Sequence, residues 1–149
     1  MVPYVRKSFY KHYIDGLRYI GHEPDDWIGQ TWNDLIDNNP SIDNTEIFAE
    51  YNAYCYAMDM TEREVHQAVE GMYHNLNTLQ SRSGNQLPFT SINYGTCTLP
   101  EGRMVTKALL KVSIEGVGKL HKTSIFPCGI FQCMKGVNRA PGDPNYDLY

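Results

Sequence analysis

The stretches LPFTSINYGT (87–96) and KTSIFPCGIFQCM (122–134) decide the fold of this chain. Both are short, rich in β-branched and aromatic residues and bounded by turn-forming residues, which is typical of β-strands. Between them, EGRMVTKALLKVSIEGVG (101–118) has the apolar period of a helix and ends at glycines. Strand, helix and strand in this order form a βαβ unit with parallel strands. The sequence therefore predicts that the second half of the chain is α/β.

Parallel strands need neighbouring strands and helices on both faces of the sheet. The first 80 residues contain no stretch typical of a strand, and no internal repeat supplies one. The chain closes with a turn-rich tail, PGDPNYDLY (141–149), in which Asp143 and Asn145 are expected to bond their own backbone. The length of 149 residues suits one domain. Because of the missing strands, we expect instead an internal piece of a larger domain.

The first half is predicted to be mainly helical. A helix over 3–20, stopped by Gly21, follows from four apolar residues spaced four apart, Val5, Phe9, Tyr13 and Leu17. The polar stretch after it is expected to be irregular, with a short helix at 31–36. A second helix is expected over 44–58.

A third helix is expected to begin at Thr61, where TERE (61–64) offers a capping box. In that motif the Thr61 hydroxyl accepts from the backbone N–H of Glu64, and the Glu64 carboxylate reaches back. The buried stripe of this helix is predicted to be Val65, Val69, Met72 and Leu76.

Composition excludes several classes of partner. The chain has 13 Lys and Arg against 17 Asp and Glu, a net charge of −4, and its cations are scattered, so we expect no direct contact with nucleic acid. There is no apolar signal segment and no run of about 18 apolar residues, so we expect no membrane partner. The sequence is that expected of a soluble cytoplasmic protein.

The four cysteines predict no metal site. They form no C-x-x-C pair and have no histidine at zinc-finger spacing, so free thiols are expected. Cys55 and Cys97 are expected to be buried. Cys128 is the one considered for a catalytic redox role, but its place in a strand favours a packed side chain, with Cys133 pointing to the opposite face.

The strand TSINYG (90–95) has one small, polar face. Ser91, Asn93 and Gly95 alternate with the bulky Ile92 and Tyr94. The polar face is either the wet face of an edge strand or a surface that binds a polar ligand.

Three stretches in order, PYVRKSFYKH (3–12), NTLQSRSGNQLPFTSINYGT (77–96) and KTSIFPCGIFQCMKGVNRAPGDPNYDLY (122–149), resemble the anaerobic (class III) ribonucleoside-triphosphate reductases, most closely the phage-type members. These are glycyl-radical enzymes that make deoxynucleotides without oxygen. The resemblance implies an internal segment of their ten-stranded α/β barrel, with 1–82 mainly helical and 83–149 forming strand, helix, strand and a turn-rich tail.

The resemblance also implies cofactors and partners, none of them held within this chain. The complete enzyme is expected to use a glycyl radical, two barrel cysteines, formate, ATP or dNTP effectors and a structural zinc. It is expected to be a homodimer activated by a radical S-adenosylmethionine protein. The M-G-C-R-like motif of the thiyl-radical cysteine, the glycyl-radical motif and the zinc cysteines do not occur here. We therefore expect no activity without the rest of the reductase chain or companion fragments.

Roles for individual residues follow from the same resemblance. Ser91, Asn93 and Gly95 are expected to form a substrate-binding wall inside the barrel, where hydroxyl and amide groups bond a ribose or phosphate and glycine permits close approach. Lys7 and Lys11, four apart on the first helix, are candidates to bind the triphosphate of an effector nucleotide. A solvated helix face is the alternative for these two lysines.

The expected function is thus part of an anaerobic ribonucleoside-triphosphate reductase that makes deoxyribonucleoside triphosphates for DNA synthesis by glycyl and thiyl radical chemistry. The alternative from another class is a small, non-catalytic binding or scaffold protein of the α/β class. A third possibility is an active enzyme reassembled from separately encoded pieces.

Overall fold

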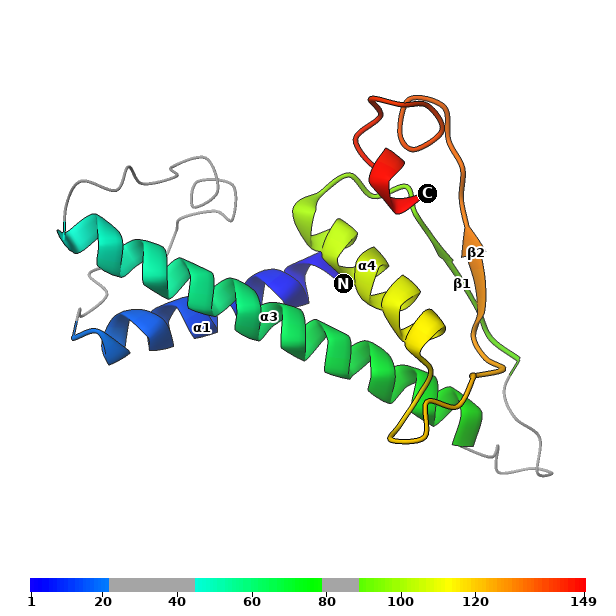
Figure 1. The fold of residues 1–149 in the computed structure, drawn as a ribbon, viewed down its shortest axis with the longest axis horizontal. Helices are drawn as coiled ribbons and strands as arrows, with labels where there is room; N and C mark the ends of the chain where they lie inside the picture. The colour runs from blue at the N-terminus through cyan, green and yellow to red at the C-terminus, as the bar shows by residue number, and fades with distance from the viewer. Residues whose placement is uncertain (22–44, 79–88) are drawn as a thin grey trace. The chain divides into compact units, whose positions relative to one another are not determined.

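The computed structural model describes residues 1–21, 45–78 (backbone only for 45–50) and 89–149 (Figure 1). Its elements are α1 (Val2–Tyr19), α3 (Thr45–Thr78), β1 (Ser91–Tyr94), α4 (Pro100–Glu115), β2 (Cys128–Phe131) and a short 3₁₀ helix, η1 (Tyr146–Leu148). They fall into two compact units, one of Val2–Glu64 and one of Val65–Tyr149 with Met1. The helix predicted at 31–36 lies outside the described residues. No helix in the described part has the length and apolarity to cross a membrane.

In the first unit, α1 packs against the N-terminal part of α3. The prediction for α1 is confirmed, since all four residues of its apolar stripe are buried. Phe9 is fully buried, and its ring lies 5.6 Å from the ring of Tyr54, centroid to centroid. A Cβ atom at Gly16 would lie 3.2 Å from the Cα of Ala53, so the small residue allows the two helices to approach closely.

One continuous helix, α3, replaces the two helices predicted at 44–58 and from Thr61, and that prediction is wrong. The Thr61 side chain is buried, and its hydroxyl donates to the carbonyl of Ala57 at 2.6 Å instead of capping a helix. A threonine inside a helix can satisfy its hydroxyl on the carbonyl four residues earlier. Residues 58–63 (MDMTER) contain no glycine or proline to interrupt the helix, so it continues.

The second unit contains the βαβ arrangement. β1 and β2 pair in parallel, with Ser91 opposite Cys128 and Tyr94 opposite Phe131, and α4 lies between them in the chain. The parallel pairing is confirmed, although each strand has four residues and is shorter than the stretch that predicted it. The chain thus combines helices with a small parallel sheet, as expected of an α/β protein.

The core of this unit comes from the second part of α3 and from α4. The Tyr73 hydroxyl forms a hydrogen bond of 2.7 Å with the Ser113 hydroxyl on α4. Tyr73 takes the place expected for Met72 and Leu76, which are only half-buried. The buried apolar residues of the two helices are Val65, Val69, Tyr73, Ala108, Leu109 and Val112.

A polar cluster joins α1 to α3 within the first unit. The Ser8 hydroxyl donates to one oxygen of Glu64, and His12 Nε2 lies 2.8 Å from the other. His12 is buried, whereas Glu64 is about half-exposed. The hydrogen bonds from Ser8 and then His12 lower the pKa of the Glu64 carboxyl, and the charge of Lys11 acts in the same direction.

The cluster makes the stability of the first unit depend on pH. Because the folded-state pKa of Glu64 is lowered, its stabilising effect is complete above the unfolded pKa of about 4.3 and is lost as the pH falls through the folded value. We expect the melting temperature of the protein to fall more steeply below pH 5 than that of Glu64→Gln, as followed by circular dichroism. Glu62→Gln, on the exposed side of the same helix, is the control and should keep the wild-type slope. If the melting temperatures of all three proteins fell equally steeply with pH, Glu64 would not be the source of the pH dependence.

Candidate functional site

The candidate site lies at the carboxyl ends of β1 and β2. Gly95 follows β1 with a φ of 110°, a conformation that favours glycine. A Cβ atom there would lie 3.0 Å from the Phe131 ring and 3.2 Å from the Gln132 carbonyl oxygen, so glycine lets β2 approach. The Gly95 carbonyl accepts hydrogen bonds from the side-chain amides of Asn138 and Asn145, at 3.0 and 3.1 Å.

Asn138 ties the ends of the two strands together. It is fully buried. Besides Gly95, its Nδ2 donates to the carbonyl of Gln132 at 2.8 Å, and its Oδ1 accepts from the backbone N–H of Met134 at 2.8 Å. One side chain therefore bonds the residue after β1 and two residues just after β2.

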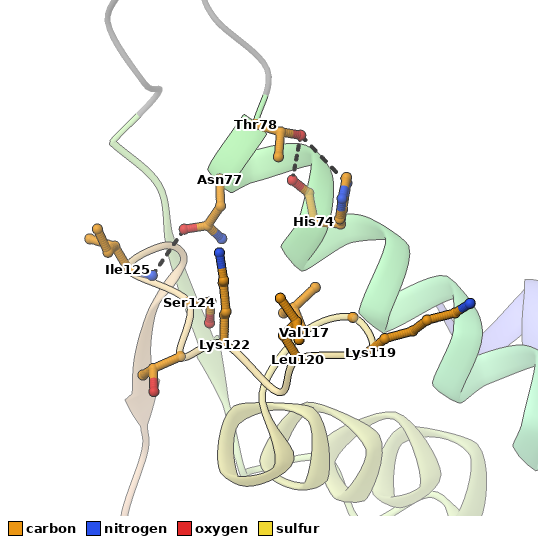
Figure 2. Close-up of a pocket in the computed structure, with 11 residues that line it drawn as sticks. His74, Asn77, Thr78, Val117, Lys119, Leu120, Lys122, Ser124 and Ile125 are labelled. Atoms are coloured by element: carbon orange, nitrogen blue, oxygen red, sulfur yellow. Dashed lines mark hydrogen bonds between the residues drawn. The ribbon is translucent and has the colours of Figure 1, made fainter.

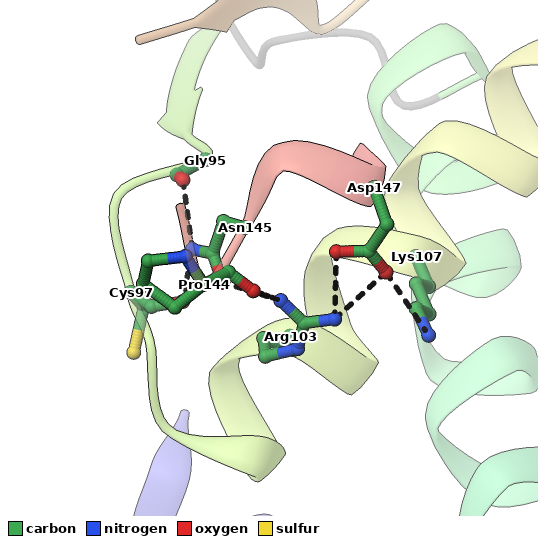
Figure 3. A network of polar contacts seen from close by, with 7 residues as sticks. All are labelled: Gly95, Cys97, Arg103, Lys107, Pro144, Asn145 and Asp147. Carbon is green, nitrogen blue, oxygen red and sulfur yellow. Dashed lines mark hydrogen bonds and ion pairs between the residues drawn. The ribbon is translucent and has the colours of Figure 1, made fainter. Parts of the chain in front are cut away.

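Asn145 is also fully buried and connects three segments (Figure 3). Its Nδ2 also donates to the carbonyl of Cys97 at 2.8 Å, and its Oδ1 accepts from Arg103 Nη1 at 2.6 Å. Arg103 further donates to the Pro144 carbonyl and, through Nη2, to both oxygens of Asp147 at 2.8 and 2.7 Å. These bonds from Arg103 hold the pKa of the Asp147 carboxyl below its usual range.

The polar strand face lies next to this anchored end. Ser91 and Asn93 are exposed, whereas Ile92 and Tyr94 at the alternate positions are half-buried. Their partners in the register are Cys128 and Ile130, which are exposed on the same face of the sheet. On the other face Tyr94 is half-buried, with its ring 5.7 Å from that of Phe131. The sheet therefore presents hydroxyl, amide and thiol groups together on one open face.

The predicted packing is wrong for Cys55 and Cys128, and Cys97 is less buried than expected. All four thiols are free, as expected, but Cys55, Cys128 and Cys133 are exposed and Cys97 is half-buried. Cys128 is exposed because the described part of the chain places no layer over that face of the sheet. Cys133 lies beyond the end of β2, so the alternation of a regular strand does not fix its direction.

The other candidate residues lie apart from the strand face in the sequence. Lys7 and Lys11 are both exposed on α1, and their effector role stays a prediction. Within the described residues, no group of three His, Cys, Asp or Glu side chains comes close enough to hold a metal ion.

A pocket of about 460 Å³ lies between the last turn of α3 and the segment that leads to β2 (Figure 2). Asn77 stands at its wall: its Oδ1 accepts from the backbone N–H groups of Ile125 and Phe126 at 2.9 and 3.0 Å, and its Nδ2 donates to the Phe126 carbonyl at 2.5 Å. Lys119 and Lys122 line the pocket but point in different directions. None of the predicted site residues lies here, so the visible role of Asn77 is to hold the approach to β2.

Sequence reasoning missed the residues that build this site. It expected Asn145 to bond its own backbone, but the side chain bonds segments about 50 residues away. Asp143 was also expected to bond its own backbone, but its Oδ2 accepts from the backbone N–H groups of Arg139 and Ala140, four and three residues earlier. A single sequence contains no signal that separates a buried asparagine from one in a surface turn.

Comparison with known proteins gives consistent matches. The sequence profile of a family described as anaerobic ribonucleoside-triphosphate reductase (NRDD) matches residues 1–149. The anaerobic ribonucleoside-triphosphate reductase of Haemophilus influenzae is 40% identical over 93 residues, which cover 62% of this chain and 13% of that protein. The protein of the same name from Enterobacteria phage T4 is 39% identical over 107 residues, which cover 72% of this chain and 18% of that protein. The matched region thus spans less than a fifth of the length of these relatives.

Removal of the Asn77 hydrogen bonds should reduce the order of the chain just before β2. Asn77→Ala removes the acceptor for the Ile125 and Phe126 N–H groups and should lower the free energy of unfolding by about 2 kcal/mol. Hydrogen exchange at these two amides should become faster, while exchange within α4 stays slow. Asn75→Ala, an exposed position on the same helix, is the matched control and should change neither quantity. Unchanged exchange at both amides in Asn77→Ala would contradict this role.

Proposed function

Because this chain belongs to the anaerobic ribonucleoside-triphosphate reductase family, we propose that it works as a segment of such an oxidoreductase, making deoxyribonucleoside triphosphates for DNA synthesis. The observation that carries the proposal is the family match over residues 1–149. The resemblance read from the sequence is thereby confirmed, including the likeness to a phage member. The alternative of a small, non-catalytic binding or scaffold protein is not favoured.

The βαβ unit supports a place within a larger barrel. β1 and β2 pair in parallel, and each outer edge of this sheet has no partner strand among the described residues. Parallel sheets are stable when further strands and helices surround them. We propose that the rest of the reductase, in the same chain or in companion fragments, supplies the other strands of a ten-stranded barrel.

The open strand face supports a role in binding substrate. Asn93 is exposed one residue before the carboxyl end of β1, and Ser91, the first residue of the strand, is exposed on the same face. Active sites of α/β barrels lie at the carboxyl ends of their strands. A hydroxyl and an amide can bond the ribose or phosphate of a ribonucleoside triphosphate. Gly95 is buried and its carbonyl is already bonded twice, which supports a role in shaping this wall.

The radical chemistry of the family is proposed for the complete enzyme. A glycyl radical would supply the unpaired electron, with formate as reductant. Among residues 1–21, 45–78 and 89–149, no group of three His, Cys, Asp or Glu side chains fits a zinc site. The exposed Lys7 and Lys11 could neutralise the triphosphate of an effector in a homodimer. A radical S-adenosylmethionine protein would be the activating partner.

The proposed function also implies a cellular place. Ribonucleoside triphosphates are cytoplasmic compounds, so the reductase would work in the cytoplasm, or in the host cytoplasm if a phage carries the gene.

The proposal predicts activity once the remaining segments are supplied. The test grafts these 149 residues into the matching region of the phage T4 relative, and measures reduction of ribonucleoside triphosphates without oxygen after activation. Turnover is expected. A soluble graft without turnover, beside an active phage protein, would contradict the proposal and favour a non-catalytic role.

The strand face predicts an effect on substrate affinity. In a complete reductase that contains these residues, Ser91→Ala and Asn93→Ala should each raise the KM for the ribonucleoside triphosphate up to about tenfold, because each loses one hydrogen bond to substrate. Thr98→Ala, exposed beyond the strand, is the control and should keep the parent KM. A parent KM in both strand variants would show that this face does not bind substrate.

A further inference from the structure

A chain of three polar side chains leads from η1 to the end of β1. We propose that Asp147, Arg103 and Asn145 act as a positioning relay, which fixes the carboxyl end of β1 and so sets the position of the Ser91 and Asn93 face. The inference rests on the proposed function of that face. All three are positioning residues, because they act on the face through the backbone and not by touching substrate.

Arg103 determines which way the Asn145 amide points. A guanidinium group only donates hydrogen bonds, so the atom 2.6 Å from Arg103 Nη1 must be the amide oxygen. The NH₂ group then faces two acceptors, the carbonyls of Gly95 at 3.1 Å and Cys97 at 2.8 Å. The reversed amide would set NH₂ against the guanidinium and the oxygen against both carbonyls. By orienting the amide, Arg103 therefore allows Asn145 to donate both hydrogen bonds to the backbone.

Asp147 in turn fixes Arg103. Both of its oxygens accept from Nη2 at 2.8 and 2.7 Å, and hydrogen bonds between charged groups are stronger than neutral ones. Lys107 also approaches Asp147, with its Nζ 3.9 Å from Oδ2. Arg103 is thus the link between the carboxylate and the buried amide (Figure 3).

The backbone that Asn145 bonds, at Gly95 and Cys97, directly follows the strand face in the sequence. Gly95 lies two residues after Asn93, and Cys97 two residues further, where the chain turns into α4. If Asn145 releases these two carbonyls, Asn138 alone holds Gly95. A shift of about 1 Å in a substrate-positioning group can cost about a hundredfold in rate. Small displacements at Gly95 are therefore enough to disturb the face.

The test uses a complete, active reductase that contains these residues. Asn145→Asp keeps the acceptor for Arg103 but loses both donors. Arg103→Lys keeps the charge for Asp147 but loses the fork that orients the amide. Each variant should raise the KM for the ribonucleoside triphosphate about tenfold. The double variant should be no worse than Asn145→Asp alone, because both changes break the same relay. Lys107→Ala is the matched control and should keep the parent KM.

The outcomes separate positioning from a merely structural role. A structural role would lower the amount of active enzyme, and hence the apparent kcat, with KM unchanged. In that case the fold losses of apparent kcat in the two single variants would also multiply in the double variant. Either result, in an enzyme whose parent turns over, overturns the relay and leaves the proposed function standing. A parent without turnover would instead overturn the proposed function and the relay with it.

Discussion

The geometry of the strand ends in the second unit depends on the hydrogen bonds to the carbonyl oxygen of Gly95. It accepts two buried amides, from Asn138 and Asn145, at a position where the backbone has a φ of 110°. A buried carbonyl without partners costs about 1–3 kcal/mol, whereas here both lone pairs are used. Through these two amides the end of β1 is joined to the end of β2 and to the tail of the chain. The pair of short strands in the described part of the chain thereby gains a fixed geometry that strand pairing alone does not provide.

The polar anchoring and the open strand face complement each other. Ser91, Asn93 and Cys128 are exposed along the two strands, whereas Asn138 and Asn145, which hold the carboxyl ends of the strands, are buried. Buried polar groups that are fully bonded give a rigid structure, because any alternative arrangement leaves a donor or acceptor unpaired. The unit therefore combines a stiff frame with an exposed polar surface, the combination that a binding wall in a larger enzyme requires.

Local patterns predicted the elements of the fold better than its connections. The stripe of α1 and the parallel βαβ order were readable, because apolar period and strand-forming residues are local properties. The break between two helices near Thr61 was expected from a capping motif, but the Thr61 hydroxyl had a second partner, the carbonyl of Ala57. The polar strand face was readable from alternation. The partners of Gly95 were not, since they lie 43 and 50 residues away in sequence.

The distance along the chain between Gly95 and Asn145 has a consequence for biosynthesis. A protein emerges from the ribosome from its N-terminus, so β1 and α4 are made well before the residues that hold them. Until Asn138, Asn145 and Asp147 have emerged, the Gly95 carbonyl has neither of its two amides and Arg103 lacks its carboxylate. Closing a loop of about 50 residues costs entropy that these late contacts help to offset. The carboxyl end of β1 is therefore completed late in translation. A nascent chain halted before residue 138 would contain β1 without the two amides that bond the Gly95 carbonyl.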